Sequence, residues 1–201
     1  MTRWLLTALL ALTTFSASAA NVADTVRQRL VQAPVLRGDF EQRKTVTGFK
    51  KPLVSHGDFL VVRERGVVWR TREPFASVLK LNQDEIVAKQ GGEIAFRLNA
   101  SQEPSVRLIN GLLFALLRGD VSGLADLFDV EGSVSDKRWQ LALTPKLAGI
   151  AKMMRKVELQ GDQYVRRIEI DETNGDHTTI LFSAQTAEPP RLTAEEASRF
   201  D

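Results

Sequence analysis

The chain of 201 residues contains no cysteine and only two histidines, His56 and His177. Without cysteine it has no disulfide and no thiolate cluster for zinc or an iron–sulfur centre. The histidines lie far apart in the sequence, and neither has a second candidate ligand at the spacing that metal sites use. We therefore expect no metal and no cofactor, and we interpret both histidines as surface residues.

The familiar arrangements of catalytic side chains are also missing. The acidic residues are scattered among basic neighbours, and no pair of carboxylates suggests general acid–base catalysis. No Gly-x-Ser-x-Gly motif occurs, and neither histidine has an evident serine partner. We expect no catalytic residue and no enzyme activity.

The charge is balanced, with 27 basic and 25 acidic residues spread along the chain. A nucleic-acid-binding protein would show a basic stripe with aromatic residues between the charges. Such a stripe is absent from the sequence, so we expect no nucleic-acid partner.

Only the N-terminus carries a long apolar run, and this run has the features of an export signal. Arg3 precedes the apolar residues 4–12, and small residues follow at 16–20. The run is shorter than the roughly 20 residues that a membrane-spanning helix needs, and its small-residue end predicts cleavage near Ala19. We expect an exported protein in which residues 1–20 are the signal peptide and 21–201 form one domain.

Residues 57–74 are the central element of the predicted fold, because they read as a β-hairpin with a turn at Arg65-Gly66. Side chains alternate across a strand, so Phe59 and Val61 share one face with Arg63, while Leu60 lies on the other. Both faces are largely apolar, and each therefore needs a cover. Arg63 ends an apolar row and needs hydrogen-bond acceptors or water, because it keeps its charge.

The other elements follow from periodicity and turn residues. Alternating segments bounded by turn signals predict further strands at 35–46, 76–81, 85–89, 93–98, 130–134, 138–143, 153–159, 164–170 and 178–183. Helical spacing of apolar residues predicts helices at 21–31, at 105–118 and, with Val121, Leu124, Leu127 and Phe128 on one face, after Asp120. The tail, 184–201, is left open as a docked strand, a docked helix or a frayed end.

A mainly β, α+β fold is the consequence of this pattern. An antiparallel sheet with so many strands tends to curl, which favours a strongly curved sheet or an incomplete barrel. The helix at 105–118 carries few charges and needs a large apolar partner surface. If it lies across the concave side, the fold encloses a closable hydrophobic cavity, although packing as ordinary core is the simpler interpretation.

Three motifs occur in a recognisable order along the chain. They are Leu36-Arg37-Gly38-Asp39-Phe40-Glu41-Gln42, then Gly57-Asp58-Phe59-Leu60-Val61-Val62-Arg63 followed by Trp69 and Pro74, and finally Leu143-Thr144-Pro145-Lys146. Together with the signal peptide and the mid-chain helices, they resemble the periplasmic outer-membrane lipoprotein carriers, the LolA/LolB superfamily, of which the chain would be a divergent member. Glu64 and Val67 stand where that family usually has a proline and an aromatic residue.

The resemblance implies an unclosed barrel of eleven strands whose helices form a lid over a hydrophobic cavity. It also implies a monomeric periplasmic carrier that takes acyl chains of lipoproteins or other lipids from an inner-membrane transporter to an outer-membrane acceptor. By the same match, Arg63 would be the latch that holds the lid closed.

The residues expected at the cavity form two groups. The wall would consist of Phe40, Phe59, Val61, Val67 and Trp69, and the lid of Leu112, Leu113, Leu116 and Leu117. Two other hypotheses stay open. The same fold could serve as a lipid- or lipoprotein-sensing module that acts through a regulatory protein partner, or as a hydrolase or isomerase with a buried polar constellation.

Overall fold

An antiparallel sheet of eleven strands dominates the computed structural model, which describes residues 19–82, 84–99, 121 and 123–200. The strands are β1 Val35–Thr45, β2 Leu53–Val62, β3 Gly66–Glu73, β4 Ser77–Leu81, β5 Glu85–Gln90, β6 Glu93–Asn99, β7 Phe128–Val134, β8 Trp139–Pro145, β9 Met154–Gly161, β10 Val165–Glu172 and β11 His177–Thr186. The described helices are α1 Ala19–Arg29, α3 Leu124–Leu127, α4 Ala148–Ala151 and α5 Ala194–Ser198.

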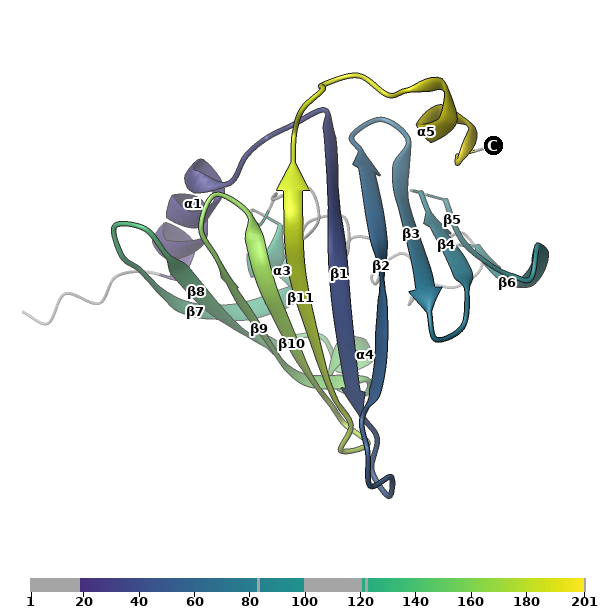
Figure 1. Cartoon of the computed structure of the whole chain (residues 1–201). Helices are drawn as coiled ribbons and strands as arrows, with labels where there is room; N and C mark the ends of the chain where they lie inside the picture. The colour runs from purple at the N-terminus through teal and green to yellow at the C-terminus, as the bar shows by residue number, and fades with distance from the viewer. Residues whose placement is uncertain (1–18, 83, 100–120, 122, 201) are drawn as a thin grey trace, which may run out of the picture.

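The strand order is β6-β5-β4-β3-β2-β1-β11-β10-β9-β8-β7. It consists of two meanders that meet where β1 pairs with β11, so the first and last strands of the chain lie side by side at the middle of the sheet (Figure 1). The sheet curves strongly, and its two end strands, β6 and β7, are not paired with each other in the described part of the chain. The predicted mainly β fold with an unclosed sheet of about eleven strands is confirmed.

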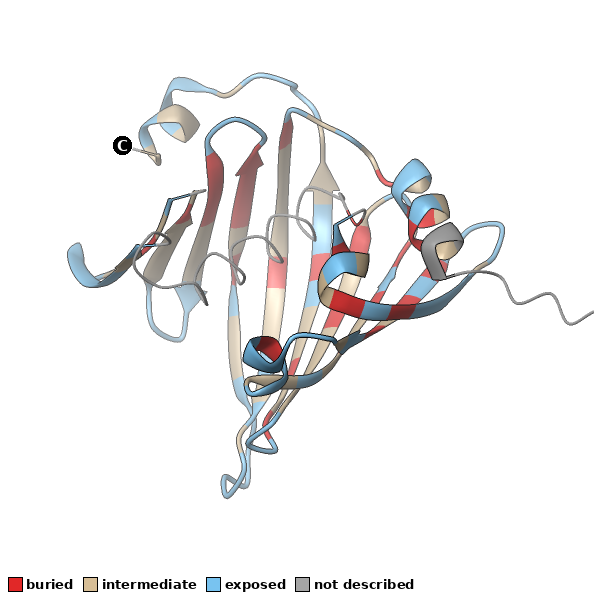
Figure 2. Cartoon of the chain, turned by 180° about the vertical axis from the view of Figure 1, so that it is seen from behind, coloured by how far each residue is buried: buried red, intermediate tan, exposed pale blue. Residues whose placement is uncertain are grey.

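The concave face carries the main hydrophobic core. Figure 2 shows buried residues along many of the strands and on the helices. Ala23, Val26 and Leu30 of α1 belong to this core, as do Leu124 of α3 and Ile150 of α4. The helices therefore cover the concave face at the β7–β9 end of the sheet.

A smaller hydrophobic cluster lies on the outer face. Val35, Leu60, Val62 and Val68 alternate with the concave residues of the same strands, and they pack against Leu192 and Phe200 near the C-terminus. Residues on both faces of the β2–β3 hairpin are thus buried, in agreement with the prediction that each face needs a cover, and on the outer face this cover includes the C-terminal segment.

The helices between β6 and β9 agree only in part with the sequence prediction. The helix predicted after Asp120 is the short α3, and Phe128, expected on that helix, begins β7 instead, since its side chain enters the core from the strand. Helix α4, in the β8–β9 connection, was not predicted because a helix of four residues is too short to show periodicity. The helix predicted at 105–118 lies outside the described residues.

Candidate functional site

Four aromatic side chains from four neighbouring strands form a cluster on the concave face. The ring centroids of Phe40 and Trp69 are 3.8 Å apart in a stacked arrangement. Phe182 makes edge contacts with Phe59 and Trp69 at centroid distances of 5.4 and 6.0 Å. The cluster joins β1, β2, β3 and β11 across the middle of the sheet. Three of its rings are buried and Trp69 is partly accessible, so the cluster is a packed aromatic core on the concave face.

Two glycines make room for these rings. A Cβ atom on Gly57 would lie 1.9 Å from the carbonyl oxygen of Arg70 and 2.7 Å from the ring of Phe40. A Cβ atom on Gly38 would lie 2.6 Å from the ring of Phe59. Each ring therefore lies over bare backbone of the neighbouring strand, a close approach that only glycine permits.

The structure brings the five predicted wall residues together. Phe40, Phe59, Val61, Val67 and Trp69 all belong to the concave cluster, in which Trp69 is partly buried and the other four are buried. Their contact with a ligand stays a prediction. The predicted lid residues Leu112, Leu113, Leu116 and Leu117 lie outside the described residues.

The apolar surface extends well beyond the aromatic cluster. Further concave side chains that pack against the core but keep part of their surface accessible are Leu36, Leu79, Leu98, Ile170 and Ile180. They come from β1, β4, β6, β10 and β11, so the partly accessible apolar surface spans most of the sheet. Such a surface can accept hydrocarbon without a polar anchor.

Arg63 lies in the turn directly after β2. Its side chain is exposed, and its backbone N–H donates to the carbonyl oxygen of Pro34 at 3.0 Å. The lid to which a latch would bind lies outside the described residues, so the latch function of Arg63 stays a prediction.

Sequence reasoning missed Phe182, although the alternation in β11 places it on the same face as Ile180. The strand was predicted, but nothing in the sequence shows that β11 pairs with β1 and brings Phe182 opposite Phe40. The missing information was the pairing of strands far apart in the chain.

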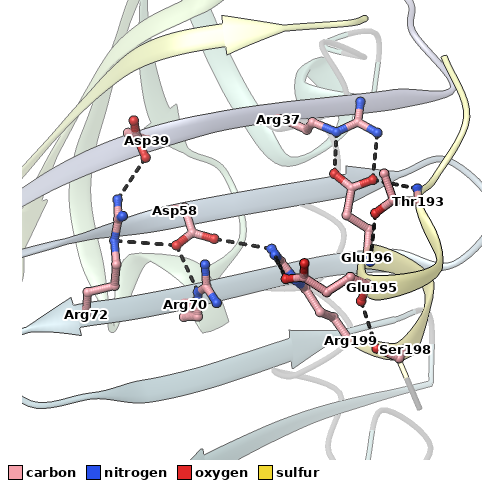
Figure 3. Close-up of polar contacts among 10 residues, drawn as sticks. All are labelled: Arg37, Asp39, Asp58, Arg70, Arg72, Thr193, Glu195, Glu196, Ser198 and Arg199. Carbon is pink, nitrogen blue, oxygen red and sulfur yellow. Dashed lines mark hydrogen bonds and ion pairs between the residues drawn. The ribbon is translucent and has the colours of Figure 1, made fainter. Parts of the chain in front are cut away.

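A second group of residues missed from the sequence is an ionic network on the outer face (Figure 3). Arg37 on β1 donates two hydrogen bonds to the carboxylate of Glu196 on α5, one of them 2.9 Å long, and both side chains are mostly buried. Arg37 also donates to the carbonyl oxygens of Pro189 and Arg191, at 2.8 and 2.9 Å. The hydrogen bonds from Arg37 lower the pKa of Glu196 to about 2, and Glu196 in turn raises the pKa of Arg37.

Asp58 is the second centre of this network. It accepts a hydrogen bond of 2.9 Å from Nε of Arg70 and lies within 3.5 and 3.6 Å of the guanidinium groups of Arg72 and Arg199. Arg65 extends the contacts, since it donates to the carbonyl oxygen of Ala197 at 3.1 Å. The network attaches α5 to the outer face of β1–β3 (Figure 3).

The start of α5 carries a sequence signal that was not used in the prediction. Thr193 and Glu196 form a reciprocal capping box, in which each side chain accepts a hydrogen bond from the other residue's backbone N–H. The spacing Thr-x-x-Glu is typical of a helix start.

In the described part of the chain, no cluster of three or more histidine, aspartate and glutamate side chains could hold a metal ion. Helices that could cross a membrane are likewise absent from the described residues.

Comparison with known proteins gives the family. The family model for outer membrane lipoprotein carrier protein LolA-like matches residues 15–200. The chain belongs to this family. The match covers nearly the whole sequence and includes all the strands of the sheet. No curated protein matches the chain by sequence.

Solved structures resemble this LolA-like chain at low sequence identity. A DUF1329 family protein from Desulfovibrio piger aligns with 91% of this chain and 98% of its own, at 11% identity and a TM-score of 0.52. The LolA superfamily protein NE2245 from Nitrosomonas europaea aligns with 90% of this chain and 97% of its own, at 11% identity and a TM-score of 0.49. The lipoprotein LppX from Mycobacterium tuberculosis aligns with 87% of this chain and 98% of its own, at 12% identity and a TM-score of 0.46. At this identity the likeness concerns the fold.

Proposed function

We propose that this LolA-like chain is a periplasmic carrier that holds the acyl chains of a lipoprotein or another lipid against its concave face and shuttles them from the inner to the outer membrane. The observation that carries the proposal is the concave apolar surface, where the aromatic cluster of Phe40, Phe59, Trp69 and Phe182 is continued by partly accessible aliphatic side chains. In this proposal residues 1–20 direct export and are removed near Ala19.

The physical task of such a carrier is to keep hydrocarbon out of water. Each methylene group that is exposed during transfer costs about 0.8 kcal/mol, so an acyl chain leaves a membrane only if a comparable apolar surface receives it. In this proposal Phe40, Phe59, Val61, Val67 and Trp69 form the wall. Trp69 and the partly accessible aliphatic side chains beside the cluster supply the surface, while the other four wall residues are buried and would be uncovered when the predicted lid opens. Since contacts of this kind are non-directional, the cargo is released when a more apolar acceptor is offered.

The same proposal assigns Arg63 to the closed state of the empty carrier. Its position in the turn after β2 leaves the guanidinium exposed and available to groups on a lid. Binding of cargo would then compete with lid closure and shift the population toward the open form. An inner-membrane transporter would supply the cargo and an outer-membrane protein would accept it.

Adjacent residues on opposite faces of β11 provide a direct test. Ile180 is partly buried on the concave face, whereas Leu181 is 39% exposed on the outer face. We expect Ile180→Gln to weaken binding of a fluorescent fatty acid about tenfold, because a polar group replaces apolar contact surface. Leu181→Gln introduces the same side chain on the other face and should leave the dissociation constant unchanged.

The wild-type protein, purified from its own periplasm, should in addition yield acyl compounds on solvent extraction and mass spectrometry. Equal loss of affinity in both variants would contradict binding on the concave face. Lipid-free protein that also fails to bind the fatty acid would contradict the carrier function itself. A protein that binds acyl chains but does not move them between donor and acceptor vesicles would instead be the lipid-sensing module.

A further inference from the structure

The hairpin of β1 and β2 projects beyond its neighbours at one end of the sheet (Figure 1). Strand β3 pairs with β2 only as far as His56, which lies opposite Glu73, so residues 53–55 extend past the end of β3. Three residues of strand correspond to about 10 Å. The turn between β1 and β2, together with the first residue of β2, comprises residues 46–53 and is named the β1–β2 tip.

The β1–β2 tip exposes two large apolar side chains. Phe49 is 67% exposed and Leu53 is 59% exposed. The backbone N–H of Phe49 donates to the carbonyl oxygen of Val46 at 3.0 Å, and Gly48 has a φ of +88°. A hydrogen-bonded turn with glycine at positive φ in its third position has a defined shape, so Phe49 is presented outward at little further cost in entropy.

The tip is also braced from the side. The backbone N–H of Thr47 donates to a carboxylate oxygen of Asp176 at 2.9 Å, and the Thr47 hydroxyl donates to the carbonyl oxygen of Asn174 at 3.4 Å. Lys44 adds ion pairs to Glu172, at 2.6 Å, and to Asp176, at 3.4 Å. The β10–β11 turn therefore holds the base of the tip in place.

The charge at the apex is positive. Lys50 and Lys51 directly follow Phe49 and are exposed, and neither forms an ion pair with another described residue. The two carboxylates that contact this region, Glu172 and Asp176, are both bound by Lys44. The apex thus combines an exposed aromatic ring with two ammonium groups that remain available for anions.

This combination fits a bilayer surface better than a protein surface. Exposed apolar side chains such as phenylalanine insert at the boundary between headgroups and acyl chains, and lysines beside them are attracted to anionic lipid. A stable protein interface buries about 800 Å² on each partner, which is more surface than a narrow hairpin end offers. A flat bilayer, by contrast, is reached first by the element that projects furthest.

We propose that the β1–β2 tip docks the protein on a bilayer that contains anionic lipid. Phe49 enters the headgroup region and Lys50 and Lys51 contact lipid phosphates. The inference goes beyond the carrier function, because the tip lies outside the concave face and requires no cargo.

The test is co-sedimentation of the mature chain with vesicles of phosphatidylcholine, with and without phosphatidylglycerol. Wild-type protein should bind the anionic vesicles, and less so at high salt. The double variant Lys50→Gln/Lys51→Gln and the single variant Phe49→Ser should each lower the partition coefficient about tenfold or more. Their thermal unfolding midpoints should match the wild type, since the three side chains are exposed.

Phe75 provides the matched control. It is 74% exposed but lies in the β3–β4 turn, beside Glu73 and set back from the apex. Phe75→Ser should leave vesicle binding within a factor of about two of the wild type. An equal loss in Phe75→Ser would overturn the assignment to the tip, as would wild-type protein that ignores anionic vesicles or binds neutral ones equally well.

Fatty-acid binding in solution separates this proposal from the carrier function. The tip variants should bind the fluorescent fatty acid as the wild type does. If acyl chains bind but vesicles do not, the docking inference fails and the carrier function stands. If the protein binds vesicles through the tip but binds no acyl chain, the docking inference stands and the carrier function fails.

Discussion

Single glycines on the concave face decide whether the aromatic cluster can form. Gly57 belongs to the Gly57-Asp58 pair of the family motif, and both residues have a clear structural reason. Gly57 lies under the ring of Phe40, while Asp58 on the other face accepts a hydrogen bond from Arg70. In this chain Gly57 therefore serves the packing of the sheet, and Asp58 serves the attachment of the outer face.

Replacing Gly57 should be strongly destabilising. In Gly57→Val the new Cβ atom would lie 1.9 Å from the backbone carbonyl oxygen of Arg70, and backbone cannot move aside as a flexible side chain can. We expect a loss of about 3 kcal/mol in the free energy of unfolding, measured by urea denaturation. Gly149→Ala is the control, because a Cβ atom there meets no other atom within 4 Å. Similar losses in both variants would show that the close approach at Gly57 is unimportant.

The wall residues could be predicted from the sequence because alternation within one hairpin determines them. Phe59, Val61, Val67 and Trp69 follow from the β2–β3 pairing, which is local. Phe182 could not be predicted in the same way, because its partner Phe40 is more than a hundred residues away in the chain. The aromatic cluster as a whole depends on that distant pairing.

Among the elements, the C-terminal segment illustrates a different limit of prediction. A helix of five residues has almost no intrinsic stability, and the sequence left open whether the tail docks or frays. The segment is held by tertiary contacts instead. Leu192 and Phe200 complete the outer hydrophobic cluster, and Glu196 binds Arg37. The Thr-x-x-Glu spacing at Thr193 is a helix-start signal that the prediction did not use, and the partner on β1 could not be read from the pattern.

Glu196 should be the residue on which this docking depends most. In Glu196→Gln the mostly buried Arg37 loses its counter-charge, and hydrogen bonds to a charged group contribute about 1.5–3 kcal/mol. We expect faster hydrogen exchange in residues 189–200 while the β-sheet core remains protected. Glu195→Gln is the matched control, since Glu195 is 79% exposed and its ion-pair partner among the described residues is Arg199. Unchanged exchange in Glu196→Gln would contradict the anchoring function.

The same pair of variants gives a pH dependence with a defined sign. The pKa of Glu196 is lowered from the ordinary 4.5 to about 2 by its hydrogen bonds with Arg37. A group whose pKa is lower in the folded state stabilises the fold above its unfolded pKa and loses that effect as the pH falls. The difference in unfolding free energy between wild type and Glu196→Gln should therefore be constant above about pH 5 and shrink toward pH 2. A difference as large at pH 2 as at pH 7 would contradict the ion pair as its source.

At the scale of the whole molecule, most strands and the open, curved sheet followed from the sequence, since turn residues and alternation are local signals. The joining of the two meanders by β1 and β11 is not local, and neither is the division of the two faces between different covers. One face packs against helices and presents accessible apolar surface, while the other is covered at β1–β4 by the chain's own C-terminal segment. This asymmetry is the reason why we propose the concave face as the binding site for a foreign hydrocarbon chain.

The extent of that surface can be measured with a series of fatty acids of increasing length. The accessible apolar residues run from Leu98 on β6 to Ile170 on β10, so a long chain should find continuous contact across the sheet. Each added methylene then contributes about 0.8 kcal/mol, a roughly fourfold gain in affinity. We expect the dissociation constant to fall with length until the chain exceeds the surface, and then to level off. Titrations should stay below the critical micelle concentration of each acid. A dissociation constant that does not change from the shortest chain onward would mean that the protein contacts only the headgroup, and the concave surface would then have no part in binding.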